Sequence, residues 1–173
     1  KMVAKAAFGG SLRIICSGGA YLDPDYVDRF REYGITILQG YGMTETSPLG
    51  SACQFKAKHQ HLSDTEQLQI RLSQGRPPFG VDLRITDAEK GTHELERDGR
   101  TSGNLQIKGH WIISNYFGKA ESALTADGWF DTGDIATLNE DGFLKISDRS
   151  KDLIKSGGEW ISSVELENLA MGH

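Results

Sequence analysis

The chain has 173 residues, of which 38% are hydrophobic and 25% charged, so its composition is that of an ordinary folded protein. Its net charge of -5, without a block of basic residues, argues against a nucleic-acid partner. No run of about 18 apolar residues predicts a membrane-spanning segment. The two cysteines, Cys16 and Cys53, predict no disulfide framework, and a cytoplasmic location is expected.

A strand, a helix and a second strand are predicted near the start of the chain. Residues 12–17 are a short apolar run typical of a buried strand, in which Cys16 would be a small buried side chain. Asp23 is a good N-cap for a helix that starts with proline and is expected to end at Gly34. Residues 35–38 form the next strand. Because such crossover connections bring the chain back in the same direction, the two strands should be parallel.

Each of these two strands runs into a glycine-rich loop. Residues 17–20 read Ser-Gly-Gly-Ala, and residues 39–48 read Gln-Gly-Tyr-Gly-Met-Thr-Glu-Thr-Ser-Pro. Parallel strands end at the same edge of their sheet, so both loops are expected at the carboxyl edge, where open α/β sheets bind ligands. This placement favours a ligand site over the alternative, a glycine-rich turn that caps a helix beginning near Thr44 or Glu45.

The second loop carries side chains suited to a nucleotide and a metal ion. Tyr41 offers a flat face for a base, and Thr44 and Thr46 can donate to phosphate oxygens. Glu45 is an oxygen ligand of the kind that Mg²⁺ accepts. Residues 39–48 are therefore the centre of a candidate nucleotide site.

The middle of the chain is expected to contain a loop and one helix. Residues 49–61 should be loop, in which His59 and His61 form a solvated pair. A zinc site is not expected there, because no cysteine or carboxylate lies at metal spacing. Residues 63–66, Ser-Asp-Thr-Glu, form a capping box that opens a helix, which Gly75 closes.

From Gly80 onward the sequence predicts β structure. Residues 81–85 alternate apolar and polar side chains as a half-buried strand does, and residues 105–108 alternate again. A charged turn region, residues 87–102, separates these two strands. Residues 121–126 are expected to form one helical turn.

A hairpin is predicted near the end of this β region. Two short strands flank an Asn-Glu-Asp-Gly turn, and the three segments are residues 135–138, 139–142 and 143–147. We expect Leu138 and Phe143 to pair across the turn. Asp134 then falls opposite Ser147, with Arg149 just beyond it. A carboxylate can accept both hydroxyls of a ribose, and arginine can donate to ribose or phosphate; the alternative is a plain surface ion pair.

Five separated stretches of the chain occur in the order in which the adenylate-forming enzymes carry them. They are residues 17–20, 41–46, 103–116, 129–134 and 148–161. From about residue 12 to its end the chain therefore resembles this family, which includes acyl-CoA synthetases, firefly luciferase and peptide-synthetase adenylation domains. Residues 155–168 look most like those of medium- and long-chain fatty-acid–CoA ligases. One departure is Asn104, where the family usually has glutamate.

The resemblance implies an α/β fold in three parts. Residues 1–79 would be the parallel βαβ part of an AMP-binding large domain, residues 80–150 a β-rich subdomain ending at a hinge, and residues 151–173 the start of a C-terminal small domain. Ser162 or Ser163 would cap a helix in that last part. The family's Ser/Thr/Gly-rich phosphate loop would lie before residue 1, so the isolated chain is expected to be an inactive fragment.

The resemblance also implies a two-step reaction. ATP and a carboxylic acid, such as a fatty acid, would give an acyl-adenylate and pyrophosphate, and coenzyme A would then form the thioester. ATP or AMP, Mg²⁺ and coenzyme A are the implied ligands, and a homo-oligomer of the complete enzyme is compatible with the sequence. Two alternatives stay open, namely transfer of the acyl group to a carrier protein and a non-catalytic nucleotide-binding fragment.

The implied site residues come one by one from the family's motifs. Thr44 would contact phosphate, Glu45 would hold Mg²⁺, and Lys151 would be the hinge about which the small domain swings; these three are the implied catalytic residues. The residues implied to border adenine, ribose, phosphate, the acyl pocket or the coenzyme A path are Gly18, Gly19, Ala20, Gln39, Gly40, Tyr41, Gly42, Thr44, Asp134, Arg149, Lys151, Lys155, Gly157, Gly158 and Trp160.

Overall fold

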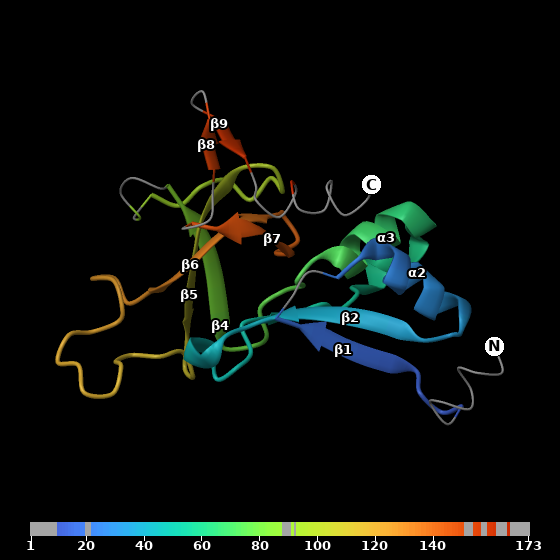
Figure 1. Cartoon of the computed structure of the whole chain (residues 1–173), viewed down its shortest axis with the longest axis horizontal. Helices are drawn as coiled ribbons and strands as arrows, with labels where there is room; N and C mark the ends of the chain where they lie inside the picture. Colours follow the sequence, from blue (N-terminus) through green and yellow to red (C-terminus); the bar gives the residue numbers. More distant parts are fainter. Residues whose placement is uncertain are drawn as a thin grey trace. The chain divides into compact units, whose positions relative to one another are not determined.

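The computed structural model of the chain describes residues 10–19, 22–87, 91, 93–150, 154–156, 159–161 and 166. The chain divides into two compact units, Lys1–Pro78 and Phe79–His173. The first unit contains a three-stranded sheet and helices, and the second contains a four-stranded sheet. Figure 1 labels most of these strands and the α-helices. The three-part domain organisation expected from the sequence stays a prediction.

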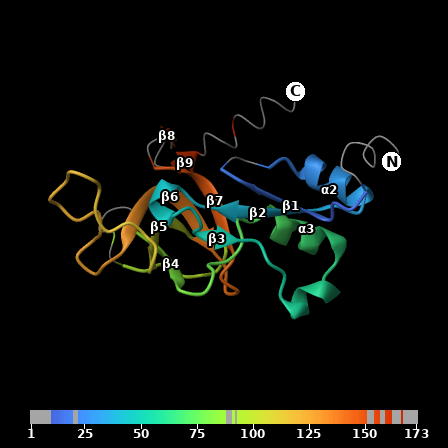
Figure 2. The ribbon, with the colours of Figure 1, turned by 90° about the horizontal axis from the view of Figure 1, so that it is seen from below.

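The first unit is built on a sheet with the strand order β1-β2-β3. Its strands are β1 (Ile14–Gly18), β2 (Thr36–Tyr41) and β3 (Ser51–Ala52). β1 and β2 are parallel, which confirms the predicted strand–helix–strand unit, and β3 returns antiparallel to β2 (Figure 2). The carboxyl ends of β1 and β2 therefore lie at one edge of the sheet, as expected.

Two helices lie on the same side of β1 and β2 (Figure 1). Helix α2 (Pro24–Glu32) begins after Asp23, whose carboxylate accepts the backbone N–H of Asp25 (2.9 Å). Helix α3 (Asp64–Leu72) begins at the predicted capping box, in which the Ser63 N–H donates to the Glu66 carboxylate (2.9 Å). Both helix starts follow from local capping chemistry, which is why the sequence predicts them well.

β1 is more exposed than the sequence predicts. Its side chains alternate between exposed and half-buried, and Cys16 is exposed. The expectation of a buried strand is wrong for this chain, because β1 is the edge strand and the buried contacts gather on β2, where Ile37 packs in the same core as Val27 of α2. The buried thiol is that of Cys53, and its burial raises the pKa to about 11.

The segment expected to be loop contains short regular structure. Besides β3, it holds the 3₁₀ helix η2 (Ala57–His61). His59 is only 4% exposed, and its Nδ1 accepts the backbone N–H of Lys56 (3.2 Å) while its ring meets the edge of Phe55. The expectation that His59 is solvated is therefore wrong, because a short-range hydrogen bond and an aromatic contact hold it inside. His61 is exposed, as expected.

The second unit is built on an antiparallel sheet with the order β4-β5-β6-β7. Its strands are β4 (Val81–Thr86), β5 (Ser102–Gly109), β6 (Phe130–Leu138) and β7 (Leu144–Arg149). Its core holds the fully buried side chains of Ile85, Leu105, Ile107, Leu138 and Leu144. Ile85, Leu105 and Ile107 are apolar positions of the predicted alternation, so the β strands expected beyond Gly80 are confirmed.

Two details of this unit differ from the expectations. β4 is not simply half-buried, because Arg84, on the face expected to be solvated, is only 7% exposed. Residues 121–126 form no helical turn; Leu124 instead makes a β-bridge to Phe130, and the Thr125 N–H donates to the Trp129 carbonyl (2.7 Å). Strand-like pairing thus takes the backbone groups that a helical turn would use.

The β6–β7 hairpin has the predicted turn and a different register. The Asn139 side chain accepts the Phe143 N–H (2.8 Å), which closes the turn at 139–142. Leu138 pairs with Leu144 rather than with Phe143, so the expected register is wrong by one residue. A β-bulge at Ser147 then shifts the pairing once more, and Asp134 lies directly opposite Arg149.

The end of the chain contains a short hairpin that the sequence analysis did not predict. β8 (Ile154–Ser156) pairs antiparallel with β9 (Glu159–Ile161). Of the helix expected after residue 163, only Leu166 is among the described residues, and it is helical. Within the described part of the chain, no helix has the length and hydropathy needed to cross a membrane.

Candidate nucleotide-binding site

A row of small residues crosses the carboxyl edge of the first sheet. Gly18 of β1 pairs with Gly40 of β2, which in turn pairs with Ala52 of β3. A Cβ added at Gly18 would lie 3.0 Å from the Gly40 carbonyl oxygen, and one added at Gly40 would lie 3.2 Å from that of Ser51. Without large side chains here, a flat ligand can approach the backbone closely.

The loop between β2 and β3, residues 42–50, closes on itself at its base. The Gly50 N–H donates to the Tyr41 carbonyl (2.8 Å), and residues Thr44–Thr46 form the 3₁₀ helix η1. A Cβ at Gly42 would lie 1.6 Å from the Pro48 carbonyl oxygen, so the loop's own packing requires glycine there. Gly42 thus has a structural reason to be glycine, whatever it contributes to a ligand.

The two threonines of this loop have opposite surroundings. Thr46 is fully buried; its hydroxyl accepts the Met43 N–H (2.9 Å) and donates to the Pro48 carbonyl (2.6 Å). The expectation that Thr46 donates to phosphate is therefore wrong, because its hydroxyl already holds the loop together. Thr44 is exposed and Glu45 is half-buried, which leaves both at the surface of the loop.

The residues of this loop fit a magnesium ion that arrives with a nucleotide. Among the described residues, no three histidine, cysteine or acidic side chains gather into a protein-only metal site. Mg²⁺ is commonly held by one or two carboxylates together with phosphate oxygens and water. One carboxylate, Glu45, beside the exposed hydroxyl of Thr44, matches that donor set.

In the second unit, Asp134 lies at the end of a bulge in β6 and directly opposite Arg149 of β7. Three residues of β6 lie opposite Leu105 alone, and the Thr132 hydroxyl donates to the Leu105 carbonyl (2.9 Å). Asp134 is 5% exposed, and its carboxylate lies 3.6 Å from the Nε of Arg149, whose side chain is 71% exposed. The predicted meeting of these two charges occurs, although through a different register.

The residue before the predicted hinge is tied to the same bulge. Both the N–H and the hydroxyl of Ser150 donate to the Gly133 carbonyl, each at 2.9 Å. Lys155 of β8 lies directly opposite Trp160 of β9. Ala20, Lys151, Gly157 and Gly158 lie outside the described residues, so their predicted roles are not placed by this structure.

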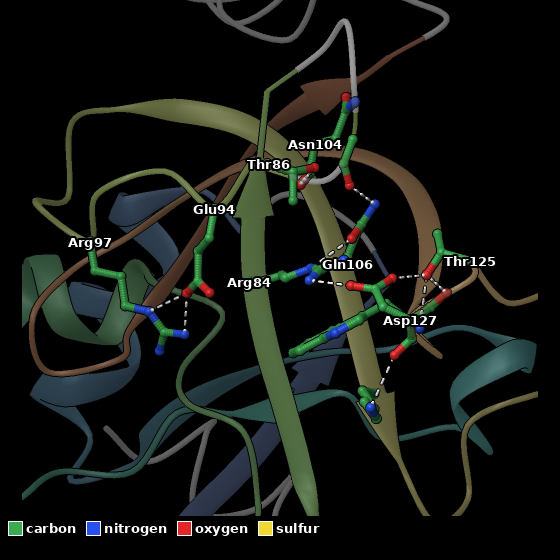
Figure 3. A network of polar contacts seen from close by, with 11 residues as sticks. Arg84, Thr86, Glu94, Arg97, Asn104, Gln106, Thr125 and Asp127 are labelled. Atoms are coloured by element: carbon green, nitrogen blue, oxygen red, sulfur yellow. Dashed lines mark hydrogen bonds and ion pairs between the residues drawn. The ribbon is translucent and has the colours of Figure 1, made fainter.

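Figure 3 shows a network around the buried Arg84 that the sequence analysis missed. The Arg84 guanidinium donates to Gln106 (2.8 Å) and pairs with Asp127 (2.7 Å). It also lies 4.4 Å from the centre of the Trp129 ring. The contacts with Arg84 and Thr125 lower the pKa of the Asp127 carboxyl. This network ties residues 125–129 to β4 and β5, directly before β6. The signal in the sequence was an arginine inside an alternating strand, which normally points to solvent.

The family assignment follows from a comparison with known proteins. The model of the family described as AMP-binding enzyme matches residues 1–117, which is more than half of the chain. The chain belongs to the AMP-binding enzyme family. This confirms the resemblance to adenylate-forming enzymes and the α/β fold class.

Relatives of this AMP-binding chain include two bacterial ligases. It is 51% identical over 164 residues to a 3-methylmercaptopropionyl-CoA ligase of Ruegeria lacuscaerulensis, covering 94% of this chain and 30% of the relative. It is 48% identical over 164 residues to a medium-chain-fatty-acid–CoA ligase of Ectopseudomonas oleovorans, with the same coverage of 94% and 30%. The chain thus spans less than a third of the length of these curated relatives.

A solved structure shares the fold of this AMP-binding chain. O-succinylbenzoate coenzyme A synthetase of Bacillus subtilis, in complex with ATP and a magnesium ion, matches with a TM-score of 0.75 and 32% identity. The match covers 93% of this chain and 31% of the synthetase.

Proposed function

We propose that the complete protein containing this chain is an ATP-dependent acid–CoA ligase for a fatty acid or a similar carboxylic acid. In the first step, a carboxylate oxygen of the acid attacks the α-phosphorus of ATP, and pyrophosphate leaves. In the second, the thiol of coenzyme A attacks the acyl carbon, and AMP leaves. The observation that carries this proposal is the glycine-rich loop with exposed Thr44 and half-buried Glu45 at the carboxyl edge of a parallel sheet.

The proposed roles follow the surroundings of each side chain. Thr44 donates to phosphate, Glu45 holds Mg²⁺, and Tyr41 packs against adenine, next to the row of small residues at the sheet edge. Asp134 binds the ribose hydroxyls, with Arg149 beside it. When bound, Mg²⁺ stabilises the negative charge that builds up on the phosphate oxygens.

The remaining proposed positions rest on the family's motifs. Gly18, Gly19 and Ala20 border the adenine and the acyl pocket, and Gln39, Gly40 and Gly42 form the backbone around the nucleotide. Lys151 is the hinge, Lys155 and Trp160 line the nucleotide side in one position of the small domain, and Gly157 and Gly158 face the coenzyme A path in the other.

The names of the relatives favour coenzyme A over a carrier protein as the acceptor, because both are CoA ligases. The two relatives are named for different acids, so the comparison supports the class of reaction better than any single acid. We propose an aliphatic acid, used in cytoplasmic lipid metabolism. Chain length is then the property that an assay with a panel of acids has to define.

The test is a pair of assays on the complete protein. Acid-dependent exchange of labelled pyrophosphate into ATP measures the first step, and consumption of free coenzyme A thiol measures the second. We expect both, with straight-chain fatty acids among the best substrates. Exchange without thiol consumption would instead support transfer to a carrier protein, and neither activity with any acid would refute the proposed ligase.

A further inference from the structure

The two ends of the loop at residues 42–50 are held by the same short segment of the chain. This loop carries Thr44 and Glu45, and it joins the end of β2 to the start of β3. Beyond β3, on the side away from β2, lie residues 74–76, which follow helix α3. We call residues 74–76 the brace.

The backbone of the brace forms hydrogen bonds with the backbone of β3. The Ala52 N–H donates to the Arg76 carbonyl and the Arg76 N–H donates to the Ala52 carbonyl, both at 2.9 Å. A Cβ at Gly75 would lie 2.0 Å from the Ala52 carbonyl carbon, so only glycine allows this approach. The hydroxyl of Ser51, which is fully buried, donates to the Gln74 carbonyl (2.6 Å). The β3 end of the loop is thereby fastened to the brace.

The brace also holds the β2 end of the loop, through a side chain. The Gln74 Nε2 donates to the Gln39 Oε1 (2.9 Å). Gln39 itself is 4% exposed. Two strand residues separate β2's Gln39 from the loop, so a hydrogen bond at Gln39 restrains the strand from which the loop departs.

We propose that Gln74 is a positioning residue that orders the loop bearing Thr44 and Glu45, and so sets the affinity for MgATP. Gln74 acts through the loop rather than by contact with a substrate. This proposal rests on the function proposed above. The side-chain amide of Gln74 restrains β2 through Gln39, and its backbone carbonyl restrains β3 through Ser51. Loss of either link leaves one end of the loop free to shift. MgATP must then order the loop when it binds, and the cost of this ordering weakens its affinity.

The test compares Gln74→Leu with Gln67→Leu in the complete protein. Gln67 is a matched control, because it lies on α3 and its side chain donates one bond of 2.9 Å, to the Leu62 carbonyl, away from the loop. We expect Gln74→Leu to raise the dissociation constant for MgATP, measured by calorimetry without acid, about five- to tenfold. The KM for the acid should stay the same, and Gln67→Leu should change neither quantity.

Hydrogen exchange of the amides at residues 42–50, measured without nucleotide, gives a second readout. It should quicken in Gln74→Leu but not in Gln67→Leu. Ser51→Ala removes the other side-chain link and should act in the same direction, which keeps the proposal testable if Gln74→Leu does not fold. Affinity and exchange equal to those of Gln67→Leu in both variants would overturn the proposal. A wild-type protein that binds no MgATP would refute the proposed function instead, while the exchange measurement would still decide the role of Gln74.

Discussion

Two threonines separated by a single residue show how burial assigns a role to a side chain. Thr44 and Thr46 carry the same hydroxyl, yet Thr46 uses its own to close the loop onto Met43 and Pro48, whereas Thr44 is exposed. Glu45, between them, is held in a 3₁₀ turn that Thr46 stabilises. The buried threonine thus presents the two residues that are proposed to meet phosphate and metal.

Glu45 can be tested by removing its charge. Glu45→Gln keeps the size of the side chain, and in the complete protein it should lower the rate of pyrophosphate exchange on the order of 100-fold, because Mg²⁺ loses an anionic ligand. The measurement is the exchange rate as a function of Mg²⁺ concentration. Glu32→Gln, an exposed carboxylate on α2, is the control and should exchange like wild type. Near-normal rates for Glu45→Gln at limiting Mg²⁺ would remove Glu45 from the metal role.

At the scale of elements, β4, β5 and the turn before β6 depend on one buried arginine. The Arg84 side chain is 9% exposed and reaches Asp127 and Gln106 (Figure 3). It also lies over the Trp129 ring. Burying a cation is costly unless it is paired and hydrogen-bonded. The planar guanidinium meets all three neighbours at once, which an ammonium group does not.

Arg84→Lys keeps the charge and loses this geometry. We expect it to lower the free energy of unfolding of the second unit by about 1–3 kcal/mol, measured by urea denaturation. Arg31→Lys is the matched control, because its ion pair with Asp64 is exposed, and it should leave stability unchanged. Equal losses in the two variants would show that the Arg84 network adds no more to stability than a surface ion pair.

At the scale of the whole molecule, the chain corresponds to part of its longer relatives. It spans 30% of the length of relatives that it matches over 94% of its own residues. The proposed activity therefore belongs to the complete protein. Ser150 is the last residue before Lys151 and is fastened to Gly133 by two hydrogen bonds, so the backbone up to Ser150 is anchored to the second unit.

The proposed hinge can be tested with proline. Proline fixes the φ angle and removes the N–H, so Lys151→Pro should hinder a swing about this residue. We expect pyrophosphate exchange to persist and thioester formation to fall at least about tenfold, because a conformational step then limits turnover. Lys151→Ala, which keeps the backbone free, should retain more thioester formation than Lys151→Pro. Equal effects of Lys151→Pro on both half-reactions would argue against a hinge.

Local signals in the sequence predicted much of the fold. The caps at Asp23 and Ser63 are hydrogen bonds to residues two or three positions further along the chain. The two glycine-rich loops and the alternation after Gly80 can likewise be recognised from short stretches of sequence. The parallel pairing of β1 and β2 followed from a general rule of chain connection. The register of the β6–β7 hairpin did not, because the turn sets Leu138 opposite Leu144 and a bulge at Ser147 shifts the pairing again, and both are properties of the paired strands.

The sequence by itself determined the family, the strand–helix–strand unit near the start of the chain and the edge of the sheet at which the two glycine-rich loops meet. These depend on motifs, periodicity and capping, which involve only residues that are close together in the sequence. Only the tertiary structure decided that Thr46, His59 and Arg84 are buried. It alone brought Gln74 to Gln39, 35 residues earlier in the chain. Burial and such distant contacts arise when elements pack, and no local pattern encodes which polar groups will then face each other.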